Sequence, residues 1–364
     1  MRVIEQILDL ARWAPSGDNT QPWRFEILAD DHVLIHGFDT RHDCVYDLEG
    51  HASQLAHGAL LETLRIAASA HGFRADVSRR PDTPDTHLLY DVRLFEDAST
   101  GPDPLLPFVK TRTVQRRPMG GKRLSAEEKQ MLEAAAHPFR VRWFETLPER
   151  WSIARLNFAN AKIRLTIREA YEVHKRVIEW GARFSEDRIP EAAVGVDPMT
   201  ARLMQWVMHS WRRVEFFNKW FAGTLGPRIQ LDLIPGIACS AHACLVAPAP
   251  QPSIEGRIAA GAAVQRFWLT CERLGLQHQP EMTPLIFNHY VRNRIRFTDT
   301  ESALALSQTL DAALTDEQGT SDIRVASWLC RIGRPKPVPG RSLRKSLFAI
   351  GGNAQVISGV IPPR

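Results

Sequence analysis

The sequence predicts a fold that combines α-helices with β-strands and repeats its plan twice within one chain. Amphipathic stretches with helical spacing alternate with shorter runs in which apolar and polar residues alternate. Two segments with the same glycine spacing lie 203 positions apart, and a second pair of similar segments occurs in the same order. Internal similarity of this kind indicates a repeated structural unit.

The first pair of similar segments predicts two helices that end in the same way. Residues 58–72 align with residues 261–275, and in each segment the closing glycine is a normal stop for a helix. The second pair sets residues 8–25 against residues 132–144. The later copy lacks the Ser-x-x-Asn loop of the earlier one. We therefore predict two diverged repeats.

A proline-rich connection separates these repeats. Pro102, Pro104 and Pro107 punctuate it, and prolines mark loops. The predicted repeats are about 1–103 and 108–364. A chain of 364 residues has room for one large domain or two of ordinary size.

Secondary structure in the first repeat is predicted from its prolines and its apolar pattern. An amphipathic helix ends before Pro15, and strand-like alternation begins after Pro22. A connection over 37–50 leads to a long helix at about 51–71, which is apolar on more than one side and is therefore expected to be buried. A strand near 88–95 follows.

Capping and periodicity predict the elements of the second repeat. Ser125, with Glu128 three residues later, has the form of a capping box and marks the start of a helix. A long helix is expected at 151–180, and strands at 237–248 and 325–332.

An unusual helix is predicted at about 199–226. Its apolar face is wider than one core contact needs, and its polar face is basic. Four interpretations stay open: a helix packed on its own core, a lid over a ligand cleft, a dimer surface, and attachment in the plane of a membrane surface.

Composition is typical of a soluble globular protein, with 44% hydrophobic and 24% charged residues. No apolar run reaches the roughly 18 residues of a membrane span, and the N-terminus has no signal-peptide core. Five cysteines without a C-x-x-C pair fit a reducing compartment, so we expect a cytoplasmic protein. The net charge of +5 permits an anionic ligand.

The sequence offers little support for metal or nucleophile chemistry. Cys239 and His242 would point to opposite faces of an extended strand, so we expect no zinc site and interpret these residues as buried. The Walker loop, the G-x-G-x-x-G loop, the H-E-x-x-H motif and the nucleophile elbow do not occur.

The polar loop after the first helix is the most informative stretch. Residues 12–25 read Arg-Trp-Ala-Pro-Ser-Gly-Asp-Asn-Thr-Gln-Pro-Trp-Arg-Phe. This string resembles the A-P-S-x-x-N-x-Q-P-W-x-F signature of the nitroreductase superfamily. The resemblance implies a dimeric α+β fold that binds FMN, in which Ser16 and Asn19 touch the flavin ring, with Gln21 in the same signature.

A basic run occupies residues 110–123, with six lysines and arginines. It could be a solvated basic turn, whereas a nucleic-acid arm is not expected because no aromatic residues are interleaved. Arginine forks beside a threonine hydroxyl also suit a phosphate. The run resembles the Arg-Ser-x-Arg element that holds the FMN phosphate in nitroreductases. The resemblance implies Arg112 and Thr113, and either Gln115 or Arg116, as phosphate ligands.

Two later segments complete the resemblance. Pro280, Glu281 and Met282 stand where the family passes its backbone along the flavin and donates an N–H toward N5. The Gly-Arg-Pro segment after residue 332 resembles the family's C-terminal G-x-P element, which implies that Arg341 or Arg344 reaches the phosphate. A solvated basic tail is the alternative.

The whole pattern is similar to the tandem, single-chain branch of the superfamily, including Acg-type proteins. It implies an intramolecular pseudo-dimer with one composite FMN site, and an inserted helical lid at about 181–230. The expected function is NAD(P)H-dependent reduction or oxidation of a small conjugated or aromatic molecule at flavin N5. The alternatives are an FMN-sequestering protein and a polyanion-binding protein. We expect a monomer, or a homodimer through the 199–226 helix, without nucleic acid or a membrane span.

Overall fold

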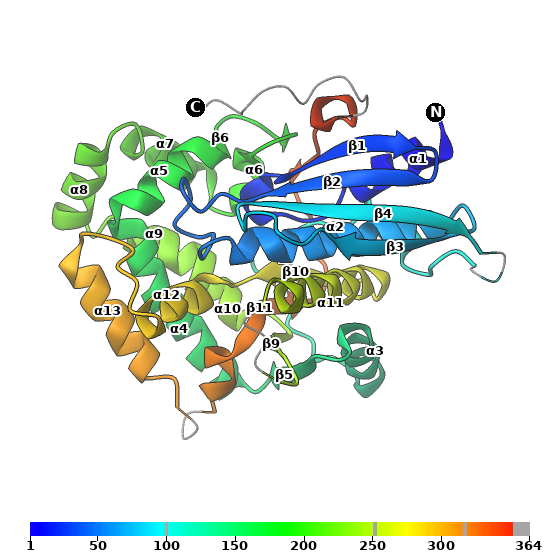
Figure 1. The fold of residues 1–364 in the computed structure, drawn as a ribbon. Coiled ribbons are helices and arrows are strands. Elements are labelled where there is room, and N and C mark those ends of the chain that lie inside the picture. Colours follow the sequence, from blue (N-terminus) through cyan, green and yellow to red (C-terminus); the bar gives the residue numbers. More distant parts are fainter. Residues whose placement is uncertain (98, 100, 250–252, 316–318, 352–364) are drawn as a thin grey trace.

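Two four-stranded antiparallel sheets, one from each half of the chain, lie on either side of a central pair of helices (Figure 1). The computed structural model describes residues 1–97, 99, 101–249, 253–315 and 319–351. Because its main sheets are antiparallel and its helices are segregated from them, the fold is α+β, as predicted.

The two sheets have the same strand order. The first contains, in order, β1 (Trp23–Ala29), β2 (His32–Phe38), β4 (His87–Glu96) and β3 (Phe73–Arg79). The second contains, in order, β5 (Arg140–Phe144), β9 (Ala241–Val246), β11 (Ala326–Gly333) and β10 (Gln277–Pro280). In each sheet the strand after the central helix, β3 or β10, takes an edge position.

The helices fall into three groups. Packed on the sheets are α1 (Val3–Ala11), α2 (His51–Ser69), α3 (Ala126–Ala136) and α11 (Ile254–Arg273). A helical region of the second half contains α4 (Leu147–Thr166), α5 (Arg168–Val177), α12 (Thr283–Arg292) and α13 (Glu301–Ala312). Between α5 and β9 lie α6 (Glu191–Val194), α7 (Pro198–Val207), α8 (Trp211–Trp220), α9 (Leu225–Arg228), the π-helical turn η3 (Ile229–Leu233) and α10 (Ile234–Ile237).

Short elements join these parts. The single turns are η1 (Gly17–Asn19), η2 (Leu106–Phe108), η4 (Ser321–Arg324) and η5 (Phe348–Ile350). Two short parallel pairs are formed by β6 (Ile178–Glu179) with β8 (Ile189–Pro190) and by β7 (Phe184–Ser185) with β12 (Arg341–Ser342). The β7–β12 pair fastens the C-terminal segment to the region that follows α5.

The central helices α2 and α11 lie side by side (Figure 1) and approach each other most closely at two glycines. A Cβ atom on Gly58 would lie 2.0 Å from the carbonyl oxygen of Ile258, and a Cβ atom on Gly261 would lie 2.0 Å from that of Leu55. The two contacts are equivalent, because Gly58 and Gly261 are 203 positions apart and so are Leu55 and Ile258. The close approach therefore explains both glycines, and it has local two-fold symmetry.

Polar contacts along the same helix pair follow this symmetry. The Gln265 amide donates to the Thr63 hydroxyl at 2.8 Å, and Arg266 pairs with Glu62 at 2.8 Å. Thr63 and Gln265 are fully buried, so their hydrogen bond removes a desolvation cost as well as adding contact. The helix pair thus joins the two halves through both apolar and polar groups.

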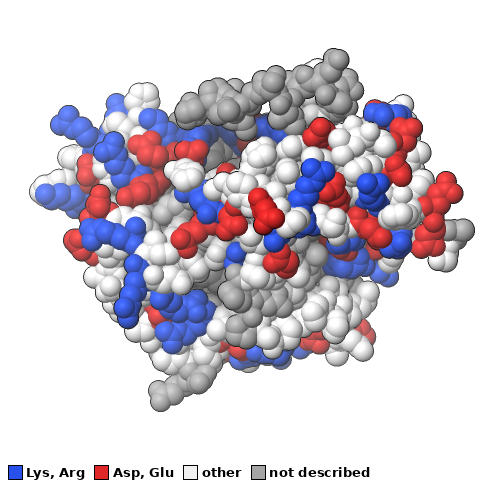
Figure 2. Space-filling model, in the orientation of Figure 1, with Lys and Arg blue, Asp and Glu red and all other residues white. Residues whose placement is uncertain are grey.

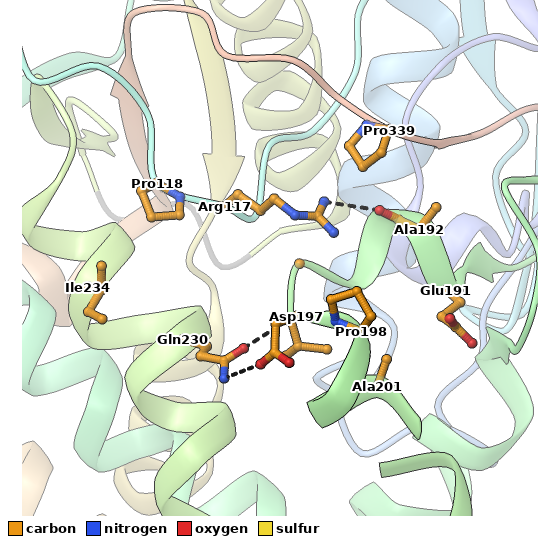
Figure 3. A pocket seen from close by; sticks show the side chains of 12 residues that line it. Arg117, Pro118, Glu191, Ala192, Asp197, Pro198, Ala201, Gln230, Ile234 and Pro339 are labelled. Atoms are coloured by element: carbon orange, nitrogen blue, oxygen red, sulfur yellow. Dashed lines mark hydrogen bonds between the residues drawn. The ribbon is translucent and has the colours of Figure 1, made fainter. Parts of the chain in front are cut away.

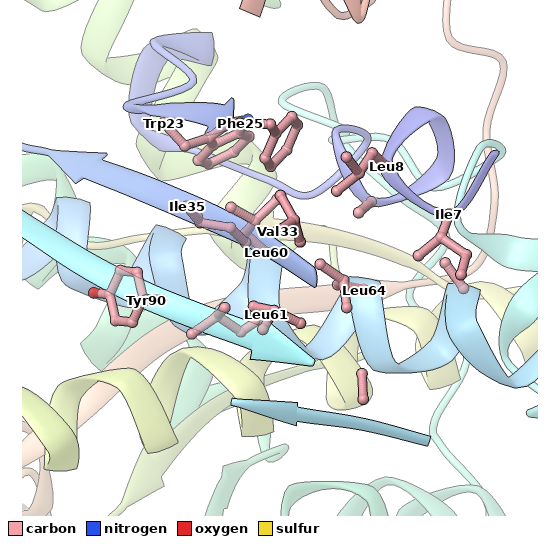
Figure 4. Close-up of a cluster of buried hydrophobic side chains, with 14 of the residues drawn as sticks. Ile7, Leu8, Trp23, Phe25, Val33, Ile35, Leu60, Leu61, Leu64 and Tyr90 are labelled. Atoms are coloured by element: carbon pink, nitrogen blue, oxygen red, sulfur yellow. The ribbon is translucent and has the colours of Figure 1, made fainter. Parts of the chain in front are cut away.

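Each sheet forms a separate core with its helices. In the first half, Ile7 and Leu8 of α1 meet Trp23 and Phe25 of β1 over the apolar face of α2 (Figure 4). In the second half, Phe267 of α11 is the largest fully buried side chain of the core formed with α3 and the second sheet. The prediction that the long helix of the first repeat is buried is confirmed.

Several element predictions were wrong in detail. Strands β2 and β3 were missed, and the predicted 37–50 connection begins inside β2. The helix expected at 151–180 breaks at Ile167, whose backbone is extended between α4 and α5. The predicted 237–248 strand starts later, because α10 occupies residues 234–237.

The predicted 199–226 helix is three short helices instead. Ser210 has an extended backbone and separates α7 from α8, and Gly223 lies in the turn between α8 and α9. The predicted capping box of Ser125 and Glu128 is confirmed, with both of its hydrogen bonds formed. The 325–332 strand is β11.

Candidate functional site

Both halves of the chain line one internal cavity of about 380 Å³. This volume lies within the range of small-molecule sites, roughly 300–1,000 Å³. The first half contributes Ser16, Asp18, Tyr46 and residues of α2 such as Leu55 and Ala59. The second half contributes Arg116, Arg164, His174, Met204, Trp268, Glu281, Met282 and Arg331, among others.

The polar loop after α1 reaches the cavity with only part of its side chains. Pro15, Ser16, Gly17 and Asp18 line the cavity, and the Ser16 hydroxyl accepts a hydrogen bond from the amide of Gln21 at 3.0 Å. Asp18, Asn19 and Gln21 have φ angles of 50°, 62° and 50°. Left-handed backbone at three non-glycine residues is costly, and such strain concentrates at functional sites.

Asn19 and Gln21 are buried and hold the C-terminal segment. The Asn19 side-chain oxygen accepts from Arg344 at 2.9 Å, and its amide donates to the Leu343 carbonyl at 3.2 Å. The Gln21 side-chain oxygen accepts from the backbone amide of Lys345 at 3.0 Å. These two predicted cofactor-binding residues therefore fasten one segment of the chain to another and lie outside the cavity lining.

Three buried or half-buried arginines gather beside this loop. Arg112 donates to the Trp13 carbonyl at 3.2 Å, Arg344 donates to the Ala14 carbonyl at 3.0 Å, and Arg341 donates to the Lys110 carbonyl at 2.7 Å. We call Arg112, Arg341 and Arg344 the arginine cluster. Within the described residues, none of the three forms a salt bridge.

The arginine cluster holds positive charge where burial opposes it. Burial lowers the pKa of Arg112 to about 9, helped by the nearby Arg341, and burial with Arg112 and Arg341 lowers the pKa of Arg344 far below its usual value. The Nε atoms of Arg112 and Arg341 are buried without a hydrogen-bond partner. An anion would supply the missing acceptors and offset the charge.

The cluster adjoins the cavity through one aromatic ring. The guanidinium of Arg112 lies over Trp268, 4.4 Å from the ring centroid, and Trp268 lines the cavity. Pro15 and Ser16, which also line the cavity, directly follow the carbonyls that Arg112 and Arg344 contact. The predicted phosphate ligands are therefore next to the predicted ring site.

The remaining residues of the predicted clamp take different positions. Thr113 is half-buried. The buried Gln115 amide donates to the carbonyls of Lys336 and Pro337 at 3.3 and 3.4 Å, so this side chain ties two segments together. Arg116 lines the cavity and donates to the Ala193 carbonyl at 3.0 Å, while burial lowers its pKa to about 10.

Pro280, Glu281 and Met282, the segment that the resemblance places along the flavin, line the cavity at the end of β10. The backbone amide of Glu281 donates to the Leu329 carbonyl of β11 at 2.8 Å. This N–H group therefore already has a hydrogen-bond partner in the second sheet. The Glu281 carboxylate contacts His242 Nδ1 at 2.6 Å and Arg331 Nη1 at 2.9 Å.

This buried His242–Glu281–Arg331 triad carries a net positive charge. His242 also faces the Gly236 carbonyl at 2.8 Å, so both ring nitrogens meet acceptors. Burial lowers the pKa of His242, but the Glu281 carboxylate outweighs it and raises the pKa to about 10. Burial raises the pKa of Glu281, and His242 and Arg331 reverse this to about 2. The sequence predicted only that His242 is buried.

Further polar pairs in the cavity wall were missed by the sequence analysis. Tyr46 and His174 are 3.1 Å apart, and Arg164 pairs with Asp232 at 2.8 Å. Burial lowers the pKa of His174 to about 3, and burial raises the pKa of Asp18 more than the neighbouring arginines lower it. These residues are distant from one another in the sequence, so no local pattern joins them.

The cavity is covered by the segment between α5 and β9. Met204 of α7, Met208 directly after α7 and Leu231 of η3 form part of its wall. A π-helical turn is rare and often marks a functional site. Two cavity-lining groups, the amide nitrogen of Asn157 and the side-chain oxygen of Gln279, are buried without a partner.

A second hollow of about 480 Å³ lies near α6 (Figure 3). Its polar side chains bond to one another or to the backbone: Gln230 donates to Asp197 at 2.7 Å, and Arg117 donates to the Ala192 carbonyl at 3.0 Å. Because these groups are satisfied, the internal cavity is the better candidate site.

Comparison with known proteins identifies the N-terminal part of the chain. Residues 1–59, which contain the polar loop, match the model of the Nitroreductase family. The matched segment supplies Ser16, Asp18 and Leu55 to the cavity.

Three mycobacterial relatives extend the comparison. In Mycobacterium tuberculosis H37Rv, the chain is 31% identical to "Uncharacterized protein Rv3127" over 104 residues, 27% of this chain and 30% of the relative. It is 38% identical to "Putative NAD(P)H nitroreductase acg" over 85 residues, 23% of this chain and 25% of the relative. In strain CDC 1551 it is 24% identical to "Uncharacterized protein MT1398" over 299 residues, 80% of this chain and 40% of the relative. The matches span well under two thirds of these relatives.

A solved nitroreductase with bound FMN from Bacteroides fragilis NCTC 9343 aligns with 72% of this chain and 99% of its own. The TM-score is 0.29 and the sequence identity 10%.

Proposed function

We propose that the chain binds FMN between its two halves and uses it to transfer electrons between NAD(P)H and a small conjugated or aromatic molecule. The observation that carries this proposal is the arginine cluster, three arginines without a salt bridge within the described residues, beside a cavity of about 380 Å³. The same class of reaction is supported by the match of residues 1–59 to the Nitroreductase family and by the similarity to "Putative NAD(P)H nitroreductase acg".

The residues present fit FMN in charge and in donor set. Arg112, Arg341 and Arg344 would hold the phosphate, because the unpartnered Nε–H groups of Arg112 and Arg341 and the excess charge of all three suit a dianion. Asn157 and Gln279 offer an unsatisfied donor and an unsatisfied acceptor in the cavity. The polar edge of an isoalloxazine ring needs both kinds of partner.

The bound flavin would supply the hydride chemistry, and the protein would supply binding, orientation and electrostatics. Met204, Met208 and Leu231 would exclude water from the ring. The net positive His242–Glu281–Arg331 triad would favour negative charge that develops in the cavity. Ser16 would orient one edge of the ring.

One composite site per chain is part of this proposal. The local symmetry of α2 and α11 and the common strand order of the two sheets support two diverged repeats at about 1–103 and 108–364. The polar loop comes from the first repeat and the arginine cluster from the second. Each repeat would thus contribute the half-site that the other has lost.

FMN sequestration with little turnover is the second candidate. The cover formed by α7 and η3 favours it, because a covered flavin would exchange slowly with bulky substrates. Anaerobic mixing with NADH or NADPH distinguishes the two functions. Rapid bleaching of the flavin absorbance supports the enzyme, whereas bleaching by dithionite alone supports storage.

The cofactor itself is tested by purification. The expected result is a yellow protein whose denaturation releases FMN. A colourless preparation that does not take up added FMN would overturn both candidate functions. Retention on DNA that falls steeply with salt would instead favour the polyanion-binding alternative, although Arg112 and Arg116 of the basic run are turned inward.

A further inference from the structure

Helices α7 and α8 expose a group of large aromatic side chains, which we call the aromatic patch. It consists of Trp206, Phe216, Phe217, Trp220 and Phe221. Trp206 is 51% exposed, Phe216 53%, Phe221 62% and Trp220 66%. Aromatic residues at this exposure give up about half or more of the burial free energy that they could gain, so their exposure calls for an explanation.

The aromatic patch is continuous. Phe217 lies at its centre, with ring centroids 5.6 Å from Trp206, 6.1 Å from Phe216 and 5.2 Å from Phe221. Trp220 is one helical turn from Phe216 on the exposed side of α8. The rings pack on one another while presenting one face to the outside.

Cations are interleaved with these rings. Residues 198–228 contain five basic residues, Arg202, Arg212, Arg213, Lys219 and Arg228, and one acidic residue, Glu215. The Arg213 guanidinium lies 4.5 Å from the centroid of Trp206, and the Lys219 ammonium 5.4 Å from that of Trp220. Within the described residues, Arg212, Arg213 and Lys219 form no salt bridge with a carboxylate.

One face of α8 combines both kinds of side chain. Its exposed side chains include Arg212, Phe216, Lys219 and Trp220, whose spacing of four, three and one residues places them on the same side of the helix. Lys and Arg side chains stand out at the left-hand end of the molecule in Figure 2, where Figure 1 places α7 and α8. A helix face that mixes unpaired cations with tryptophan and phenylalanine suits the boundary between lipid headgroups and acyl chains.

We propose that the aromatic patch and its cations dock on the surface of an anionic lipid bilayer, with α8 lying in the plane of the surface. The rings would enter the headgroup boundary, and the cations would meet lipid phosphates. Attachment is peripheral, because no helix among the described residues is both long and apolar enough to cross a bilayer.

Charge favours a lipid surface over a second copy of the chain. A two-fold dimer would place the patch against itself, so Arg212 and Lys219 would face the same cations of the partner. Glu215 alone could not compensate them. An anionic bilayer offers the opposite charge over the whole area of the patch. This inference does not depend on the proposed flavin chemistry.

Co-sedimentation with vesicles tests the inference. The full-length protein is mixed with vesicles of phosphatidylcholine alone or of equal parts phosphatidylcholine and phosphatidylglycerol. We expect binding to the anionic vesicles only, weakening with added salt. The double change Arg212→Ser with Lys219→Ser should reduce partitioning about thirtyfold, from roughly fivefold for each cation near an anionic surface. Phe216→Ser with Trp220→Ser should abolish binding.

A matched control exists at the opposite end of the molecule. Arg74 lies over Phe95, 5.3 Å from its ring centroid, and Phe95 is 44% exposed. Arg74→Ser with Phe95→Ser removes the same kind of pair and should leave vesicle binding unchanged. Absence of binding by the wild-type protein, or equal loss in the control, overturns the proposal.

Light scattering distinguishes a self-associating surface. A concentration-dependent dimer that disappears in the Phe216→Ser, Trp220→Ser variant, without vesicle binding by the wild type, would assign the patch to a second copy and overturn the proposal. If that variant does not fold, the charge variant and the salt dependence of the wild type decide the question, because Arg212 and Lys219 are exposed.

Discussion

Arg112 combines features that structural arginines rarely show together. It is buried, it forms no salt bridge within the described residues, and its Nε atom has no hydrogen-bond partner. A protein interior tolerates such a charge only when something compensates it. The stacking on Trp268 compensates part of the cost, and a bound anion would compensate the rest.

Replacing this arginine tests the phosphate assignment. Arg112→Ala should weaken FMN binding by about 1.5–3 kcal/mol, because it removes a charge-assisted contact, and Ser16→Ala should weaken it less. Fluorescence titration of the apoprotein with FMN measures both. Lys110→Ala is the control, because Lys110 is exposed and contacts Asp9 at 3.4 Å. An Arg112→Ala protein that keeps stoichiometric FMN through long dialysis would remove the assignment.

The His242–Glu281–Arg331 triad predicts a dependence of stability on pH. The folded-state pKa of His242, about 10, lies above its ordinary value of 6.5. Its contribution to stability is therefore complete below pH 6.5 and is lost as the pH rises toward 10. His242→Leu should cost about 3–5 kcal/mol at neutral pH and should flatten this loss. Urea unfolding between pH 7 and 10 would measure it.

His174 provides the comparison for that experiment. Burial lowers its pKa to about 3, so it is neutral in the folded protein throughout the tested range. His174→Leu should leave the alkaline loss of stability as steep as in the wild type. An identical slope in all three proteins would show that His242 is not charged in the fold.

Side-chain direction limited what the sequence could say about individual residues. Ser16, Arg116, Pro280, Glu281 and Met282, which the motifs singled out for the cofactor, all line the cavity. Asn19, Gln21 and Gln115 instead hold other chain segments. In a loop with left-handed residues, sequence spacing does not determine which way a side chain points. Contacts across more than 300 positions, such as Asn19 with Arg344, leave no local signal.

At the scale of elements, the close approach of α2 and α11 depends on two glycines. Gly58→Ala should destabilise the protein by about 1–3 kcal/mol, because the new Cβ would overlap the backbone of α11 and force the helices apart. Gly261→Ala should have a similar effect by symmetry. Thermal or urea unfolding measures both changes.

Gly226 is a suitable control glycine. It lies in α9, and a Cβ atom there would meet nothing within 4 Å. Gly226→Ala should leave stability unchanged or raise it slightly. Equal stability of the Gly58→Ala protein and this control would mean that α2 and α11 can separate freely, and that the close approach contributes little.

Periodicity predicted long elements better than their interruptions. The helix at 51–71 was found to within two residues because its apolar pattern is uniform over several turns. The single helix predicted at 199–226 was wrong, because apolar residues continue at helical spacing through Ser210 and Gly223. Only tertiary contacts decide where such a pattern bends.

On the scale of the whole molecule, the two halves should share one cofactor. Denatured, purified protein should release about one FMN per chain, because the polar loop occurs once and the arginine cluster occurs once. Absorbance of the released flavin against protein concentration by amino-acid analysis measures the ratio. Two FMN per chain would contradict a composite site and would mean that each half of the chain holds a complete FMN site.

Overall architecture was accessible from the sequence because repetition constrains it. The offset of 203 positions relates Gly58 to Gly261 and Leu55 to Ile258 in space as well as in number. The matched order of the two sheets follows the same relation. The path of residues 178–233 has no counterpart in the first repeat, so no internal comparison could predict it.

Helix α7 presents Met204 to the cavity and Trp206 to the outside. The ten residues of this helix therefore connect binding in the cavity with binding at the outer surface. If contact with a surface shifts that helix, the affinity for whatever fills the interior must change, and the interior ligand must alter surface affinity by the same factor. A small displacement of this one helix would couple binding at the lipid surface to retention of the ligand in the cavity.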